Sequence, residues 1–269
     1  MPQKFIAACL QMNAVDNVAA NLARAGELLQ QAADQGAKLA ALPEYFPLIA
    51  ADETLKLRIA EKDNSGPIQD FLAKAAQQHS IYLVGGALPI DAGNGRVFSA
   101  CPLYAPDGQR LARYDKMHLF RFVGRQDKAD ETTTIVPGCA PIAVDTDLGR
   151  IGLCVCYDLR FPELFRAMQK PDIIVAPSAF TRETGAAHWE ILLRARAIEN
   201  IAHLLAPAQA GTHPGGRKTF GHSMIIDSWG RVLAKANGNG DAVITAMIDG
   251  KEREEQRARL PALHHRLLP

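Results

Sequence analysis

Short apolar segments with the composition of β-strands alternate with helix-like segments along this chain. The first unit comprises a strand predicted over residues 5–11, a helix over 18–35 and a second strand over 39–42. Alternation of this kind, with no linker rich in proline or serine, predicts one α/β domain over residues 1–269 with helices on the outer faces of its sheets. So many strands fit two sheets packed face to face better than one open sheet.

The rest of the chain continues the same pattern. Further helices are predicted over 68–79, 163–169 and 187–199. Further strands are predicted over 81–88, 97–104, 111–115, 142–144, 150–156, 172–176, 202–208, 223–226, 232–235 and 242–248. Residues 120–141 are predicted to form one long loop, because glycine and proline interrupt them. Residues 251–269 are charged and then apolar, and we expect them to form a tail that packs on a partner subunit.

The balance of charges narrows the class of partner. Thirty Lys and Arg residues against 29 Asp and Glu leave a formal charge of +1, so no net field attracts nucleic acid or an anionic membrane. We therefore expect a small-molecule or protein partner. The apolar run at the N-terminus is too short for a signal peptide and no later segment approaches a membrane-spanning length, which favours a cytoplasmic location.

The cysteines are odd in number, scattered and mostly embedded in apolar segments, so we expect them to be reduced. They are Cys9, Cys101, Cys139, Cys154 and Cys156. The last two are one residue apart, but no further cysteine or histidine spacing completes a zinc site. We therefore expect no metal site.

Cys156 stands where an apolar, strand-like run ends and a polar turn into a helix begins. That position suits a nucleophile, because a sharp turn after a strand lifts the side chain to the edge of the sheet. A small buried hydrophobic role is the alternative that the local residues leave open.

Two more chemical groups stand at predicted strand ends. Glu44 follows Pro43 after an apolar strand, and the adjacent aromatic residue Tyr45 favours a partly dry pocket, which makes a carboxylate more basic. Lys116 lies beside an apolar, aromatic segment, where an ammonium group can stabilise an oxyanion. Glu131, in the long loop, is a weaker candidate for a catalytic role on its local sequence. Each of these residues has an ordinary solvated side chain as its alternative.

Taken together, these motifs resemble the Glu-Lys-Cys triad of the nitrilase (carbon-nitrogen hydrolase) superfamily. The matching segments are Leu-Pro-Glu44, Tyr-Asp-Lys116-Met-His-Leu-Phe and Cys156-Tyr-Asp-Leu-Arg-Phe-Pro-Glu-Leu, in the order expected. The resemblance covers nearly the whole chain. It implies a four-layer α-β-β-α sandwich with two mixed sheets, usually in at least a homodimer. It also implies hydrolysis of non-peptide carbon-nitrogen bonds without a metal or an organic cofactor.

The resemblance also implies a role for each residue. Cys156 would be the nucleophile and Glu44 the general base. Lys116 and the backbone N–H of Tyr157 would hold the oxyanion, and Glu131 would orient the lysine and the base. The products would be a carboxylate and ammonia, released through a cysteine thioester.

Within the superfamily the sequence is similar to the Nit branch, and most similar there to deaminated-glutathione amidases. Thr181 favours that group over the ω-amidases of 2-oxoglutaramate, which tend to have asparagine at this position. Arg182 follows the pocket motif directly and is the best candidate for a carboxylate anchor. The predicted substrate-binding residues are Tyr45, Tyr157, Phe180, Thr181, Arg182 and His188.

Some alternatives remain open at this point. An N-carbamoyl amino acid hydrolase or a non-catalytic binding scaffold would keep the same fold. The family usually places an acidic residue after Phe120, whereas this chain has Arg121, followed by Arg125 and Lys128. These basic residues either contact the substrate or are simply solvated.

Overall fold

The computed structural model describes residues 4–123 and 128–267, and within these ranges the strands form two large mixed sheets. The first has seven strands in the order β17-β1-β2-β3-β5-β4, with β6 on β5. Its strands are β1 (Lys4–Gln11), β2 (Ala37–Ala41), β3 (Tyr82–Val84), β4 (Leu88–Asp91), β5 (Val97–Tyr104), β6 (Arg110–Asp115) and β17 (Ala242–Asp249). The parallel strands β1, β2 and β3 lie at its centre.

The second sheet has six strands in the order β16-β15-β12-β11-β10-β9 within the same described residues. Its strands are β9 (Ile142–Thr146), β10 (Gly149–Leu153), β11 (Ile173–Val175), β12 (His203–Ala206), β15 (Met224–Ile226) and β16 (Val232–Lys235). The strands β10, β11 and β12 run parallel and are buried almost throughout. Such continuous apolar strands are typical of parallel sheets that are covered on both faces.

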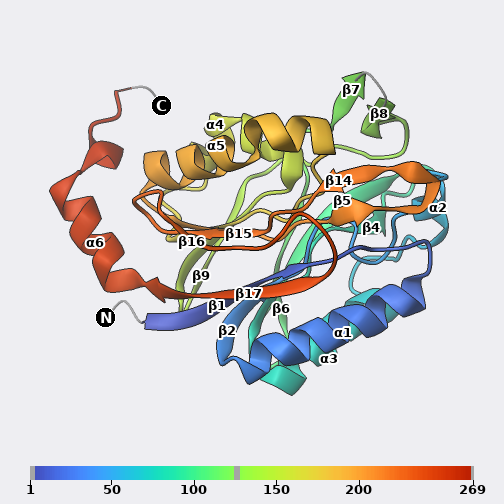
Figure 1. The fold of residues 1–269 in the computed structure, drawn as a ribbon, viewed down its shortest axis with the longest axis horizontal. Coiled ribbons are helices and arrows are strands. Elements are labelled where there is room, and N and C mark those ends of the chain that lie inside the picture. Colours follow the sequence, from blue (N-terminus) through green and yellow to red (C-terminus); the bar gives the residue numbers. More distant parts are fainter. Residues whose placement is uncertain (1–3, 124–127, 268–269) are drawn as a thin grey trace.

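The helices form the two outer layers (Figure 1). On the first sheet lie α1 (Val18–Asp34) and α3 (Pro67–His79), and on the second lie α4 (Pro162–Ala167) and α5 (Arg182–Asn200). One apolar core fills the space between the sheets and another lies beneath α1 and α3. The predicted α-β-β-α sandwich with two mixed sheets is therefore confirmed.

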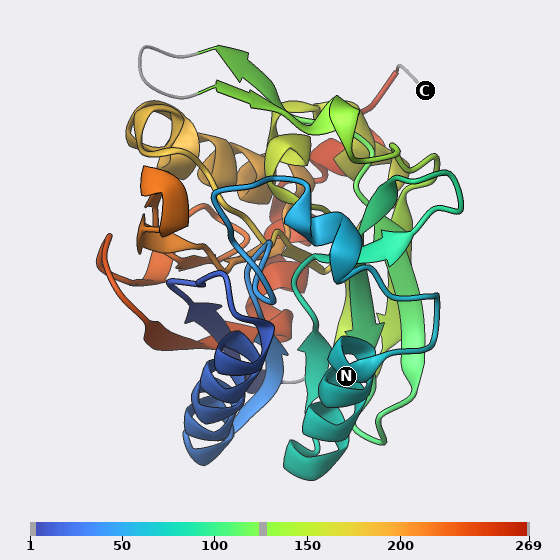
Figure 2. The same cartoon turned by 90° about the vertical axis from the view of Figure 1, so that its right-hand side faces the viewer.

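Several local predictions were wrong. The strand expected over 81–88 is divided into β3 and β4, because Gly86 adopts a positive φ of 65° and turns the chain between them. The loop expected over 120–141 contains the hairpin of β7 (Arg121–Val123) and β8 (Lys128–Asp130). The prediction also missed α2 (Leu55–Arg58) and the small hairpin of β13 (Ala210–Thr212) and β14 (Lys218–Phe220). In Figure 2 α2 (light blue) and the β7–β8 hairpin (green) lie at the end of the sandwich that faces the viewer.

Part of the expected C-terminal tail is the helix α6 (Gly250–Arg259), which contacts its own chain. Arg257 donates to Asp172 at 2.6 Å and to the carbonyl oxygens of Ile201 and Pro171. Arg253 also lies 3.2 Å from Asp172. Packing of the remaining tail on a partner subunit stays a prediction.

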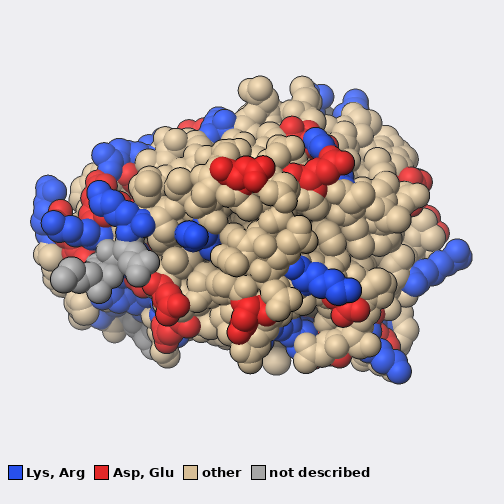
Figure 3. Space-filling model, turned by 90° about the horizontal axis from the view of Figure 1, so that it is seen from below, with Lys and Arg blue, Asp and Glu red and all other residues tan. Residues whose placement is uncertain are grey.

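The surface carries charges of both signs. On the face covered by α1 and α3, acidic and basic side chains are interspersed among uncharged ones (Figure 3). This pattern agrees with the nearly neutral total charge. Among the described residues, no helix has the length and apolarity needed to cross a membrane.

Candidate active site

Cys156 lies at a strained turn just beyond strand β10. The strand ends at Leu153, three residues earlier than predicted, and Cys156 opens a 3-10 helix that runs to Arg160. The backbone of Cys156 has a φ of 50°, a left-handed conformation that is costly for a residue with a side chain. Its N–H donates to the carbonyl oxygen of Pro177 at 2.9 Å, which fixes the turn to the strand end of β11.

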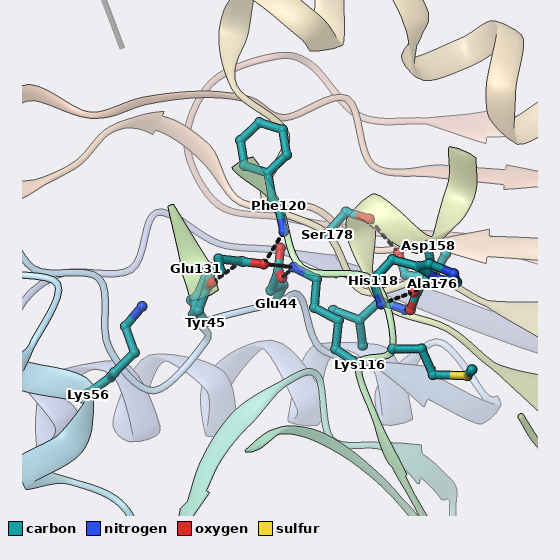
Figure 4. Close-up of polar contacts among 12 residues, drawn as sticks. Glu44, Tyr45, Lys56, Lys116, His118, Phe120, Glu131, Asp158, Ala176 and Ser178 are labelled. Carbon is teal, nitrogen blue, oxygen red and sulfur yellow. Dashed lines mark hydrogen bonds and ion pairs between the residues drawn. The ribbon is translucent and has the colours of Figure 1, made fainter. Parts of the chain in front are cut away.

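A buried carboxylate ties this turn to the segment that carries Lys116. Asp158 accepts hydrogen bonds from the Tyr114 hydroxyl at 2.7 Å and from the Val155 N–H at 2.8 Å. Its second oxygen accepts the N–H of His118 at 3.1 Å and lies 2.7 Å from His118 Nδ1 (Figure 4). Because all these groups converge on one carboxylate, the nucleophile turn and the Lys116 segment hold a fixed position relative to each other.

Lys116 lies between the two predicted glutamates (Figure 4). Its Nζ is 2.8 Å from one oxygen of Glu44 and 2.8 Å from both oxygens of Glu131. Glu131 also accepts hydrogen bonds from the Tyr45 hydroxyl and from the Phe120 N–H at 2.7 Å. All three charged side chains are buried.

The surroundings move the pKa values of the two glutamates in opposite directions. Burial raises the pKa of Glu44, and the attraction of Lys116 does not fully offset it. Burial alone would also raise the pKa of Glu131, but the Lys116 ammonium and the hydrogen bonds from Lys116, Tyr45 and Phe120 lower it overall. These opposite shifts make Glu44 the better proton acceptor of the two and keep Glu131 negatively charged.

Lys116 stays charged and Cys156 stays neutral in the resting site. Burial would lower the pKa of Lys116, but the charges of Glu131 and Glu44 raise it overall. Burial raises the pKa of the Cys156 thiol, and the charge of Glu44 raises it further. The thiol lies close enough to the Glu44 carboxylate for the two groups to interact. A neutral thiol beside a buried carboxylate needs that carboxylate to take its proton when it reacts.

These groups open into a pocket of about 300 Å³. Its wall contains Glu44, Glu131 and Cys156 together with the aromatic side chains of Phe120, Tyr157 and Phe180, and its polar groups include Thr181, Thr184, Arg160 and Arg217. A pocket with apolar walls and a few convergent polar groups is typical of a small-molecule site.

A family model described as Carbon-nitrogen hydrolase matches residues 6–258. The chain belongs to the carbon-nitrogen hydrolase family. A deaminated glutathione amidase of Synechocystis sp. is 40% identical over 98% of this chain and 98% of its own length. A human omega-amidase is 35% identical over 97% of this chain and 95% of its own length.

Solved structures show the same carbon-nitrogen hydrolase fold. The C. elegans NitFhit protein superposes with a TM-score of 0.90 at 32% identity, over 98% of this chain and 65% of that protein. Nit3 of Saccharomyces cerevisiae, titled a member of branch 10 of the nitrilase superfamily, has a TM-score of 0.88 at 28% identity over 99% and 97% of the two chains. The predicted resemblance to the superfamily and its Nit branch is thus confirmed.

The structure brings most of the predicted residues of this carbon-nitrogen hydrolase together. Glu44, Glu131 and Cys156 line the pocket, and Lys116 lies directly behind the two glutamates. Tyr157, Phe180 and Thr181 also line it. The Thr181 hydroxyl accepts a hydrogen bond from the Thr184 N–H at 3.2 Å and so caps helix α5.

Other predicted residues lie elsewhere. Arg182 is the first residue of α5, which begins five residues before the predicted start; its side chain is exposed and does not line the pocket. His188 is exposed six residues further along α5, and its ring contacts Arg160 at 3.3 Å. Tyr45 lies behind Glu131, outside the pocket wall.

The basic loop is placed only in part. Arg121 has an exposed side chain 3.4 Å from Asp130 and does not line the pocket. Arg125 and the side chain of Lys128 lie outside the described residues.

The sequence prediction missed two arginines that do line the pocket. Arg160 follows Cys156 by four residues, and its guanidinium lies over the rings of Tyr157 and Phe180 at 5.7 and 5.6 Å. Arg217 comes from the loop before β14, far along the chain, and no local motif marked it. Within the described residues, no group of three or more His, Cys, Asp or Glu side chains is arranged to hold a metal ion.

Proposed function

We propose that this carbon-nitrogen hydrolase cleaves a carboxylate-bearing amide through a thioester on Cys156, with deaminated glutathione as its preferred substrate. The observation that carries the proposal is the meeting of Cys156, Glu44, Lys116 and Glu131 at one pocket, with opposite pKa shifts on the two acids. The 40% identity to a deaminated glutathione amidase over nearly the whole chain supports the choice of substrate.

The first half of the reaction forms the thioester. Glu44 takes the proton of the Cys156 thiol as the sulfur attacks the amide carbonyl carbon. The carbonyl oxygen becomes an oxyanion, which Lys116 and the Tyr157 N–H stabilise. The Tyr157 N–H is free to donate because the first N–H groups of a helix, here the 3-10 helix that starts at Cys156, have no partner within that helix. The intermediate collapses, the carbon-nitrogen bond breaks, and Glu44 returns its proton to the leaving nitrogen.

The second half releases the acid. Glu44, again ionised, takes a proton from a water molecule, whose oxygen attacks the thioester carbonyl carbon. Collapse of this second intermediate breaks the carbon-sulfur bond, and Glu44 returns the proton to the thiolate of Cys156. The leaving group is ammonia when the substrate is a primary amide and an amine when it is a secondary amide.

Arg160 takes the place in the proposal that the sequence had suggested for Arg182. Its guanidinium lines the pocket and is half-buried against two aromatic rings. Arginine binds carboxylates through two parallel hydrogen bonds, so Arg160 is positioned to hold the keto-acid end of the substrate.

An ω-amidase acting on 2-oxoglutaramate is the second candidate. The human omega-amidase, 35% identical over 97% of this chain, supports it. Both substrates carry the same keto-acid end and differ in the leaving group. The part of the pocket that binds the keto-acid end therefore does not distinguish them.

We also propose a homo-oligomer in the cytoplasm. Ile191 and Ile198 lie two turns apart on α5 and are 71% and 47% exposed, and Trp229 beside that helix is 47% exposed. Large apolar side chains gathered on one face favour contact with a second copy of the chain. The free thiols of all five cysteines, which lie in the described residues, support a reducing compartment.

A substrate panel tests the proposal. Release of 2-oxoglutarate is measured from deaminated glutathione and 2-oxoglutaramate, and release of acid from N-carbamoyl amino acids and simple nitriles. We expect deaminated glutathione to give the highest kcat/KM. Faster turnover of 2-oxoglutaramate would select the second candidate, and turnover of nitriles alone would contradict both.

A further inference from the structure

A second, polar pocket of about 260 Å³ adjoins the catalytic pocket at Arg217. This arginine contributes to the walls of both pockets. The second pocket lies between residues 45–56, which lead into α2, and the loop before β14. These two segments are in close contact, since a methyl group added at Gly215 would be 2.7 Å from the Cβ of Ala51. Arg217 therefore stands between the space at Cys156 and this second space.

Two cations converge in the second pocket. Arg217 lies over the ring of Tyr45 with its guanidinium 5.4 Å from the ring centre, and Lys56 Nζ lies 5.3 Å from the same centre. Figure 4 shows Lys56 on the side of Tyr45 away from Lys116. A single carboxylate, that of Glu53, is bound by both: one oxygen is 3.1 Å from Arg217 and the other 2.5 Å from Lys56.

The three charged residues differ in how firmly they are held. The Lys56 side chain is only 11% exposed and that of Arg217 27%, whereas that of Glu53 is 56% exposed. The two cations are thus fixed parts of the wall. The Glu53 carboxylate is more than half exposed, so it can turn into solvent when another carboxylate takes its place on the two cations.

We propose that this pocket is the subsite for the leaving group. Arg217 and Lys56 bind a carboxylate on the departing amine, and Glu53 occupies that position until a substrate displaces it. The proposal rests on the proposed function. It selects secondary amides whose amine half ends in a carboxylate, as the cysteinylglycine half of deaminated glutathione does, over primary amides that release only ammonia.

Selectivity follows from an exchange of one carboxylate for another. A substrate carboxylate replaces Glu53 on the same two cations, so no buried charge is left unpaired. A primary amide releases only ammonia and has no carboxylate to place on these two cations. The kcat/KM ratio between deaminated glutathione and 2-oxoglutaramate therefore reports on the subsite, while the wild-type turnover itself reports on the proposed function.

The test measures this ratio in Arg217→Met, Lys56→Met and Glu53→Gln, with Lys218→Met as the control. Lys218 is exposed and adjacent to Arg217 in sequence, and it lines neither pocket. We expect the ratio to fall about 10- to 100-fold in Arg217→Met and Lys56→Met, to rise in Glu53→Gln, and to stay unchanged in Lys218→Met.

The opposite changes in the kcat/KM ratio expected for Arg217→Met and Glu53→Gln distinguish a binding subsite from a structural ion pair. If the three residues only stabilise the loops, removing either partner lowers the activity on both substrates together. A ratio that changes in the same direction in Arg217→Met and Glu53→Gln, or changes in neither, overturns the proposal. Binding of cysteinylglycine to Cys156→Ala, measured by calorimetry, gives a readout without turnover: we expect Arg217→Met to weaken it, and equal affinity overturns the subsite.

Discussion

The Lys116 ammonium lies 2.8 Å from both carboxylate oxygens of Glu131, in a site where both side chains are buried. This pair fixes the position of the ammonium group that we propose to stabilise the oxyanion. Glu44 shares the same ammonium through one oxygen and has a raised pKa where Glu131 has a lowered one, which supports its proposed role as the base.

Glu131→Gln is predicted to lower kcat by about 100-fold or more, because a preorganised charge that stabilises the oxyanion is lost when Lys116 is no longer held. KM should change little, since Glu131 holds the lysine rather than the substrate. Steady-state kinetics check this, with Glu255→Gln on exposed α6 as a matched control that removes one carboxylate. Near-normal kcat in Glu131→Gln would show that the pair has no part in catalysis.

The acid limb of the pH profile is predicted to lie above the ordinary glutamate pKa of about 4.3. Burial raises the pKa of Glu44, and the residue must be ionised to accept the proton of Cys156. As the pH falls through this raised pKa, Glu44 is protonated and kcat/KM decreases. A profile of kcat/KM against pH measures the limb, and a midpoint at or below the ordinary value would count against Glu44 as the base.

Gly138→Ala is predicted to impair the site from a distance. Gly138 donates its N–H to the carbonyl oxygen of Lys116 at 2.9 Å, and an added methyl group would lie 2.1 Å from the backbone oxygen of Asp115. The strand end that carries Lys116 must then move, so we expect both kcat and thermal stability to fall. Gly26→Ala in helix α1 is the control, because its methyl group meets only Phe71 at 3.7 Å and alanine favours a helix. Unchanged kcat in Gly138→Ala would show that the close contact does not hold Lys116.

Asp172→Asn is predicted to loosen α6 and to destabilise the fold by about 1.5 to 3 kcal/mol, the range for hydrogen bonds to charged groups. Burial alone would raise the pKa of Asp172, but the Arg150 N–H and the charges of Arg253 and Arg257 lower it. This stabilisation is therefore fully present above the ordinary aspartate pKa of about 3.9 and is lost as the pH falls below it. Urea unfolding at neutral and acid pH measures both effects, with exposed Asp145→Asn as the control. A loss of equal size at both pH values would contradict the assignment.

The sequence was informative where local pattern and chemistry coincide. Glu44 and Cys156 each follow a largely apolar strand with a parallel partner, and such strand ends commonly carry reactive groups. Lys116 follows β6, an antiparallel strand in which only Tyr114 is buried, so its motif was the stronger signal. The motif around Cys156 even includes Asp158, which joins the turn to Tyr114. The position of these residues could thus be predicted, although their distances from one another could not.

The sequence failed where position depends on contacts between distant segments. Arg182 was chosen because it follows Thr181, but Thr181 caps α5 and the next side chain then points outward from the first turn. Arg217 reaches the pocket only because the loop before β14 folds against the segment around Ala51, which leads into α2. Tyr45 was placed correctly near the site, but its hydroxyl contacts Glu131 instead of lining the pocket.

The most direct test of the central claim is the release of 2-oxoglutarate from deaminated glutathione by Cys156→Ala, beside wild-type enzyme at equal concentration and equal thermal stability. If Cys156 forms the thioester, the variant loses turnover by about 10⁴-fold or more, as expected when a covalent nucleophile is removed. Turnover by Cys156→Ala within about 10-fold of wild type would contradict the account, because no thioester can form without the sulfur.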